Sequence, residues 1–480
     1  MPLRTSIRST RLSTSFPHID APSYLRTFAP FVMDLYPTRG NRKPTFPILP
    51  LMPLTQDLSY ITGDLPGIGG RIKQRPEDFL VEEAPLYEPS GEGEHLYLFI
   101  EKQELTTSDA IRRIAKAFRV SRREVGYAGL KDKHGVTRQH VSLHLPENDV
   151  AADRDSIQRL RYYEPRLKLL WQARHGNKLR RGHHGGNRFV IYVRGVEPTA
   201  VLRVRSILER LDREGVPNYF GEQRFGYRAN GHVLGRHLLC GDDQPFLDEL
   251  LGRPESNESE ALQAARAAYD RGDIDGALEL WPRSLRFDRQ ALDALRQQRA
   301  SAEAVGMIDE SHRHLLVSAL QSAAFNRVVD RRIREGRFPQ LIEGDLAWKH
   351  DSRAVFAADA EAVAEDNAAG GRVERLAVSP SGPMWGRGMT RAAGEADRIE
   401  VEALEAEGLS PEAMEVERDA PAITPGGSRR PMRVRLKDAD VSGGVDEQGG
   451  FVRVAFELPR GAFATMAMRE VMKNAAIHQA

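Results

Sequence analysis

Strand patterns lie on both sides of a long helical block in this sequence. Residues 94–100 and residues 452–458 carry the apolar spacing of strands. Residues 231–332, between them, are dominated by Ala, Leu, Arg and Glu, which favour helices. A domain inserted into a parent sheet domain predicts this order, and two tandem domains also fit it. In either case the chain combines helices and strands within a mixed architecture.

Length and composition narrow the class of protein. The chain of 480 residues is long enough for two or three domains. Its one cysteine, Cys240, excludes a disulfide framework and a cysteine-based zinc site. No run of about 18 apolar residues predicts a membrane span, so we expect an intracellular, cytoplasmic protein. The net charge of +1 hides a basic stretch in the N-terminal half and an acid-rich stretch at residues 357–419.

Residues 1–52 differ from the rest of the chain. They are rich in Ser, Thr, Arg and Pro, and residues 1–16 contain no acid, which is typical of an organelle transit peptide. The alternatives are a disordered tail, or a start assigned too far upstream, with Met33 or Met52 as the true first residue. Recurrent proline would break an amphipathic helix, so these alternatives are favoured.

Four segments carry local patterns that bear on function. Residues 71–83 form a strand pattern that a turn at Pro76 interrupts. A helix follows, with Ser108 as its expected cap and apolar residues at helical spacing as far as Phe118. Further helices are predicted over residues 200–214 and 464–473.

A charged loop lies between two strand-like segments at residues 124–145. Asp132 stands between Lys131 and Lys133, with His134 next and Arg138 just beyond. Nearby positive charge favours an ionised carboxylate. Functional residues often lie on loops that a sheet supports, although an Asp beside a Gly is frequently only a turn residue. The pattern indicates a carboxylate that acts on a polyanion.

Residues 161–188 are strongly basic, and Glu164 is the only acid among them. Basic side chains neutralise phosphates, and aromatic side chains stack on unpaired bases. The candidates for contact with RNA are Arg174, Lys178, Arg180 and Arg181, near the aromatic residues Tyr162, Tyr163 and Trp171. A solvated charged face is the alternative. Histidines in this segment lack cysteines or clustered carboxylates nearby, so no metal site is expected.

Five short motifs complete the pattern. They are Pro-Glu-Asp-Phe at 76–79, Ala-Gly-Leu-Lys-Asp-Lys-His at 128–134, Asn-Arg-Phe at 187–189, Asn-Tyr-Phe-Gly-Glu-Gln-Arg-Phe-Gly at 218–226 and Leu-Pro-Arg-Gly-Ala-Phe-Ala-Thr at 458–465. From about Gly67 onward the chain thereby resembles the TruD family of tRNA pseudouridine synthases. Residues 1–52 and parts of 355–420 match nothing in that family.

The resemblance implies an α+β fold. A pseudouridine-synthase catalytic domain, with a mostly antiparallel sheet and flanking helices, would contain an inserted α/β TRUD domain. The expected parts are an N-terminal extension at 1–52, the catalytic domain at 53–212 and 427–480, and the insert at 213–426. Gly135 departs from some relatives, which have Ala there, and the insert carries extra acidic sequence.

The resemblance also implies a reaction without cofactor or metal. A uridine of tRNA, at position 13 in the D-stem for bacterial members, would become pseudouridine. Asp132 would act as nucleophile or as base. Phe79 would stack on the target base, Asn187 would orient Asp132 or the base, and Phe189 would pack against the base. Lys73 would be a basic neighbour of the site.

Two other functions compete with this one. An RNA-binding module of the same fold would have no need of Asp132. A nucleoside glycosidase would cleave the same bond, but it usually needs a metal or a cluster of carboxylates around the sugar. Only one suitable Asp was found in the sequence.

Overall fold

The computed structural model describes residues 58–133, 135–147, 149–415 and 424–474. The expectations for residues 1–52 therefore lie outside the described residues, as does His134. Within the described ranges no helix is both long and apolar enough to cross a membrane.

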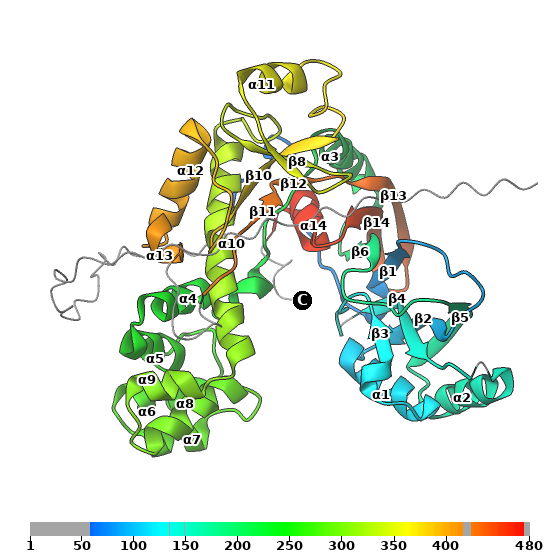
Figure 1. Ribbon diagram of the computed structural model, residues 1–480, viewed down its shortest axis with the longest axis horizontal. Coiled ribbons are helices and arrows are strands. Elements are labelled where there is room, and N and C mark those ends of the chain that lie inside the picture. Colours follow the sequence, from blue (N-terminus) through cyan, green and yellow to red (C-terminus); the bar gives the residue numbers. More distant parts are fainter. Residues whose placement is uncertain (1–57, 134, 148, 416–423, 475–480) are drawn as a thin grey trace, which may run out of the picture. The chain divides into compact units, whose positions relative to one another are not determined.

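One sheet of eight strands forms the base of the candidate site (Figure 1). Its order is β13-β14-β6-β1-β4-β2-β5, with β3 paired to β4. All pairs are antiparallel except β1 with β4, which run parallel. The strands are β1 (Phe79–Pro85), β2 (His95–Gln103), β3 (Val125–Tyr127), β4 (Val136–His144), β5 (Leu167–His175), β6 (His184–Arg194), β13 (Lys437–Asp446) and β14 (Gly449–Pro459).

Helices pack on this sheet through alternating apolar side chains. Leu96, Leu98 and Ile100 of β2 share a buried cluster with Ile111 and Ile114 of the first helix. A second cluster joins β1, β6 and β14 to the helices farther along the chain. The helices are α1 (Thr107–Phe118) and α2 (Val150–Tyr163) in the first cluster, and α3 (Val201–Glu214) and α14 (Ala464–Met472) in the second. The mainly antiparallel sheet with flanking helices confirms the expected α+β class.

The cap residue of the first helix lies two residues earlier than predicted. Thr106, rather than Ser108, is the cap residue, and its hydroxyl accepts a hydrogen bond from the backbone NH of Asp109 at 3.0 Å. Ser108 lies inside the first turn, where its backbone is already helical. Ser and Thr are both favoured as cap residues, and the chain uses Thr106 in place of the predicted Ser108.

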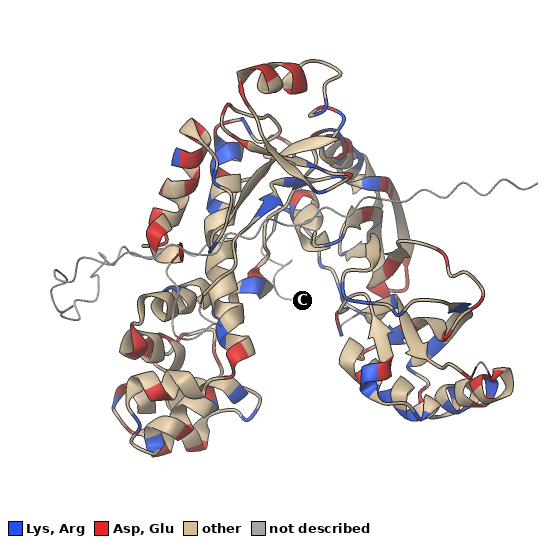
Figure 2. Ribbon diagram, in the orientation of Figure 1, with Lys and Arg blue, Asp and Glu red and all other residues tan. Residues whose placement is uncertain are grey.

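The expected helical block is confirmed at residues 231–334. Its helices are α4 (Gly231–Cys240), α5 (Asp243–Leu251), α6 (Glu260–Asp270), α7 (Ile274–Leu280), α8 (Arg286–Arg296), α9 (Ser301–Met307) and α10 (Glu310–Arg334). They enclose a cluster of their own that includes Phe246 and Trp281. The acid-rich stretch forms α11 (Ala360–Asn367), α12 (Gly394–Glu405) and α13 (Pro411–Glu415), and Figure 2 shows acids gathered on α11 and α12.

A second, four-stranded sheet accompanies these helices, in the order β11-β10-β8-β9. Its strands are β8 (Leu346–Lys349), β9 (Val355–Ala357), β10 (Val378–Met384) and β11 (Ser428–Pro431). Two short strands, β7 (Val216–Pro217) and β12 (Arg433–Val434), pair where the chain leaves and re-enters the first sheet's segments. We propose that the inserted domain lies between β7 and β12. Its sheet then includes β11, just past the expected boundary at residue 426.

A buried ion network fixes the start of β1. The 3₁₀ turn Pro76–Asp78 precedes Phe79, and Asp78 accepts hydrogen bonds from Arg194 of β6 at 2.7 and 3.1 Å. The same guanidinium reaches Asp446 of β13 at 2.6 Å. The hydrogen bonds that Arg194 donates to these carboxylates raise its pKa. Charge-assisted bonds of this kind hold geometry well, so the network sets where Phe79 enters the sheet.

Candidate active site

The loop that carries Asp132 connects β3 to β4 and is held at three main-chain points. The Thr107 hydroxyl accepts from the NH of Lys131 at 2.9 Å. The Lys102 ammonium donates to the carbonyl of Asp132 at 2.8 Å. The carbonyl of Ala128 accepts from the NH of Gly182 at 2.7 Å. Asp132 itself is exposed, so a carboxylate is presented to solvent on a loop whose backbone is tied down.

Lys131 is buried behind this loop rather than displayed beside Asp132. Its side chain is 5% exposed, and its ammonium lies 3.1 Å from Oε2 of Glu83. It also donates to Oδ1 of Asn187 at 2.5 Å. The charge of Lys131 is therefore balanced by Glu83. The sequence predicted Lys131 and Lys133 as the cations beside Asp132, and it missed the partner at the end of β1.

Glu83 is the buried carboxylate of this group. Burial alone would raise its pKa, but hydrogen bonds from His140 and the charge of Lys131 outweigh that effect and lower the pKa. The backbone NH of His140 lies 3.2 Å from Oε1, and Nδ1 of the ring lies 3.4 Å from the same atom. An ionised Glu83 is thus the counterion of Lys131, and through Lys131 it is joined to Asn187.

A second histidine borders the same group. His184, at the start of β6, is buried, and burial followed by the charge of Lys131 lowers its pKa. A side chain added at Gly129 would come within 4 Å of His184, Lys131 and Glu83. The loop therefore runs directly over these three side chains. Neither histidine was singled out from the sequence, because their partners are distant along the chain.

Phe79 and Phe189 lie next to each other on neighbouring strands. Their ring centres are 6.5 Å apart at an angle of 61°. The ammonium of Lys73 lies 4.8 Å from the centre of the Phe79 ring, a cation–π distance. The rings are only 3% and 6% exposed. The structure thus brings Phe79, Phe189 and Lys73 together, and their contact with a base stays a prediction.

Gly135 lies at a position of the Asp132 loop where the backbone favours glycine. Its φ of +139° is in the region that glycine favours, and an added Cβ would lie 2.6 Å from the carbonyl oxygen of Phe79. The loop therefore packs directly on the backbone of Phe79. In this chain an alanine would push the loop away from the aromatic pair.

The four predicted RNA-contact residues fall into two groups. Arg174 is paired with Asp153, with which it forms a salt bridge, and also donates to the carbonyl of Leu145 at 2.8 Å. Lys178 donates to the carbonyl of Arg123. Arg180 and Arg181 are exposed, and Arg181 donates to the Tyr127 hydroxyl at 2.8 Å.

The exposed pair is the one that lies near Asp132. Gly182, the next residue, bonds to Ala128 at the start of the Asp132 loop. It also accepts from the guanidinium of Arg460 through its carbonyl. Arg180 and Arg181 therefore belong to a basic edge of the site, whereas the ion pair of Arg174 supports the sheet.

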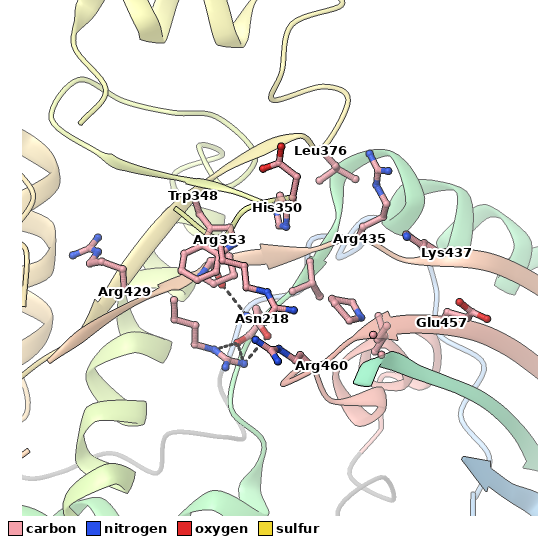
Figure 3. Close-up of a pocket in the computed structure, with 18 of the residues that line it drawn as sticks. Asn218, Trp348, His350, Arg353, Leu376, Arg429, Arg435, Lys437, Glu457 and Arg460 are labelled. Carbon is pink, nitrogen blue, oxygen red and sulfur yellow. Dashed lines mark hydrogen bonds between the residues drawn. The ribbon is translucent and has the colours of Figure 1, made fainter. Parts of the chain in front are cut away.

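A cavity of about 910 Å³ begins at the ends of β1 and β6. Ala84 and Gly186, which line it, are the neighbours of Glu83 and Asn187. Figure 3 shows Arg353, Arg435, Lys437 and Arg460 around the same space, while Arg429 is directed away from it. Arg429 is paired with buried Glu400 at 2.6 Å. The acids that line the cavity are Asp351 and Glu457.

Arg430 is a half-buried cation of this cavity. It donates to the side-chain oxygen of Asn218 at 2.6 Å and to the carbonyl of Gly461 at 2.9 Å. Its guanidinium lies 4.2 Å from the centre of the Phe220 ring. Burial, followed by the charge of Arg224, lowers its pKa to about 9. Basic, aromatic and hydrogen-bonding groups thus meet in a space suited to an anionic, partly aromatic ligand.

The structure combines a mainly antiparallel sheet, flanking helices, an exposed Asp on a loop with a fixed main chain, and a basic cavity. The family model described as tRNA pseudouridine synthase D (TruD) matches residues 56–471. The chain belongs to the TruD family.

Individual relatives agree with that assignment. The chain is 44% identical to the tRNA pseudouridine synthase D of Geobacter sulfurreducens over 420 residues, which cover 87% of this chain and 97% of the relative. It is 38% identical to that of Anaeromyxobacter dehalogenans over 422 residues, again 87% and 97%. The crystal structure of a putative tRNA pseudouridine synthase D from Methanosarcina mazei matches with a TM-score of 0.72 at 26% identity, over 87% of this chain and 97% of that one.

Proposed function

We propose that Asp132 is the catalytic carboxylate with which this chain isomerises a uridine of tRNA, at position 13 in the D-stem, to pseudouridine. The reaction class follows from membership of the TruD family. The assignment of Asp132 rests on one observation above all. Asp132 is an exposed carboxylate on a loop whose main chain is bonded at three points.

The chemistry requires an ionised acid at the sugar. The bond from C1′ to N1 breaks, the uracil turns, and C5 joins C1′ while the hydrogen of C5 leaves as a proton. Asp132 acts on the sugar as nucleophile or as base, and both roles need the carboxylate form. An exposed position beside cations supports that form. The reaction conserves the atoms of the nucleotide, so no oxidant or group donor enters it.

The cavity supplies the binding surface in this proposal. A uridine within a stem must leave its stack before a carboxylate can reach C1′. The cations of the cavity, with Arg180 and Arg181 at its edge, bind the phosphates around the extruded nucleotide. Phe79 and Phe189 contact the base, and Asn187 orients it. Because tRNA is the substrate, we assign the enzyme to the cytoplasm.

Tritium release from tRNA labelled at C5 of uridine tests the proposal. Turnover must release label, because pseudouridine formation replaces the hydrogen at C5. We expect release by the wild type and none by Asp132→Asn, with tRNA affinity unchanged in both. Equal release by the two proteins would remove Asp132 from the chemistry. Binding without any release by the wild type would favour an RNA-binding module.

The D-stem assignment has a separate test. Mapping of the product in unfractionated tRNA should locate pseudouridine at position 13. Modification at another position would overturn the assignment of the site while leaving the reaction class intact.

A further inference from the structure

We propose that Lys102 is a positioning residue for Asp132, which holds the main chain of the catalytic loop from the buried side. Lys102 is on β2, 30 residues before Asp132, and it belongs to none of the five motifs. The inference rests on the proposed catalytic role of Asp132.

The position of Lys102 is unusual for a lysine. The residue is 1% exposed, and its ammonium donates to the carbonyl of Leu105 at 2.7 Å and to that of Asp132 at 2.8 Å. Lysine is almost never fully buried unless it is paired. Within the described residues, no carboxylate lies within salt-bridge distance of this ammonium. Its two acceptors are main-chain atoms that set the course of the loop.

The charges around Lys102 can be named one by one. Asp132 raises the pKa of Lys102 and Lys131 lowers it, but burial is the larger effect and brings the pKa to about 8. Its neighbours in the sheet, Thr137 on β4 and Leu167 on β5, carry no charge. Thr107 of α1, which bonds to the loop, is also uncharged. The charge of Lys131 is already balanced by Glu83.

The two hydrogen bonds of Lys102 therefore fix the backbone of the loop. A fixed carbonyl at Asp132 fixes the backbone from which the catalytic side chain projects. Retaining a poorly solvated ammonium at this place costs folding free energy. A role in orienting Asp132 accounts for that cost.

The experiment compares Lys102→Met and Lys102→Arg with the wild type in single-turnover tritium release. Lys116→Met, on the exposed side of α1, is the matched control. Because small displacements of a catalytic group can cost about 100-fold in rate, we expect Lys102→Met to lower kcat by about that factor. The KM for tRNA should change by less than about twofold, because Lys102 contacts no solvent-facing surface.

The alkaline side of the profile gives a second readout. The wild-type rate should fall as pH rises through about 8, where Lys102 loses its proton. Lys102→Arg keeps its charge throughout, so it should recover most of the rate and lack this fall. The uridine titrates equally in both reactions and does not produce the difference. This comparison uses the wild type and the conservative variant, so it holds even if Lys102→Met does not fold.

The proposal is overturned if Lys102→Met behaves like Lys116→Met, or if kcat and tRNA binding fall together. It is also overturned if the wild type and Lys102→Arg share one alkaline limb. Asp132→Asn, assayed in parallel, separates the two inferences. Full activity of that variant would end the role of Asp132, whatever Lys102 does.

Discussion

The Asp132 loop and the basic cavity differ in how far their charged side chains are paired. Behind the loop, each buried ionic group has a fixed partner: Lys131 with Glu83 and Asn187, and Lys102 with two carbonyls. Around the cavity, Arg353, Arg435, Lys437 and Arg460 outnumber Asp351 and Glu457. Paired charges and hydrogen bonds give rigidity, and unbalanced positive charge gives affinity for an anion. Changes at the loop should therefore alter the rate, and changes at the cavity should alter binding.

The largest effect is expected for Asp132→Asn. The amide has nearly the shape of the carboxylate but no charge, so kcat should fall by about 10⁴-fold. The affinity for tRNA, measured by filter binding, should stay within about twofold, because one exposed side chain contributes little to a large polyanion contact. A parallel loss of affinity would break the division between loop and cavity.

Glu83→Gln should come next, because it removes the counterion of a buried lysine. We expect kcat to fall about 100-fold and the free energy of unfolding to fall by about 3 kcal/mol. Urea denaturation gives the second quantity. The matched control is Glu82→Gln, the neighbouring residue, whose carboxylate pairs with the half-exposed Arg138. An equal effect of the two substitutions would contradict the role of the buried pair.

The same carboxylate predicts a dependence of stability on pH. The folded state lowers the pKa of Glu83 below its usual value of 4.5. Its contribution to stability is therefore present above pH 4.5 and is lost as pH falls through the folded value. The difference in unfolding free energy between wild type and Glu83→Gln should shrink below that pH. A difference that is constant with pH would show that Glu83 does not titrate.

Substitutions in the cavity should have smaller effects, and on a different quantity. Arg353→Ala with Arg435→Ala should raise KM about tenfold and reduce the slope of log affinity against log salt by about 2, one for each phosphate contact. The double substitution Arg180→Ala with Arg181→Ala should change KM and the salt slope in the same way. Arg205→Ala, on the exposed side of α3, is the control. A fall in kcat at saturating tRNA would extend the catalytic role into the cavity.

Removal of metal should have the smallest effect of all. The proposed reaction uses a carboxylate and phosphate-binding side chains, so dialysis against EDTA should leave kcat within about twofold at constant ionic strength. tRNA that is folded in advance and added back with magnesium separates an effect on the RNA from one on the protein. Loss of activity that only a metal restores to the enzyme would contradict the mechanism.

The sequence predicted the site in part, and the limit has a physical cause. Asp132, Phe79, Phe189 and Asn187 stand in short motifs, and the structure places the last three on the paired strands β1 and β6. Glu83, Lys102, His140 and His184 act through distant partners, so no local pattern exposes them. From the sequence, a lysine in a strand is predicted to be exposed, and only the fold shows which elements bury it.

The basic segment shows the same limit in the opposite direction. By composition, Arg174 and Arg180 were equal candidates for contact with RNA. In the structure Arg174 is paired with Asp153, whereas Arg180 is exposed. Strand periodicity decides which side of the sheet each residue faces, and the ion pair depends on where α2 packs. Charge counted along the chain cannot distinguish a buried salt bridge from a free cation.

The place of β14 in the sheet bears on the order in which the sheet can form. β14 lies between β13 and β6, so this edge of β6 stays open until residues 449–459 have been made. An open edge is a site for pairing with another chain, which the final segment closes. During synthesis, the β6 edge is therefore exposed to association with other chains until β14 has folded onto it.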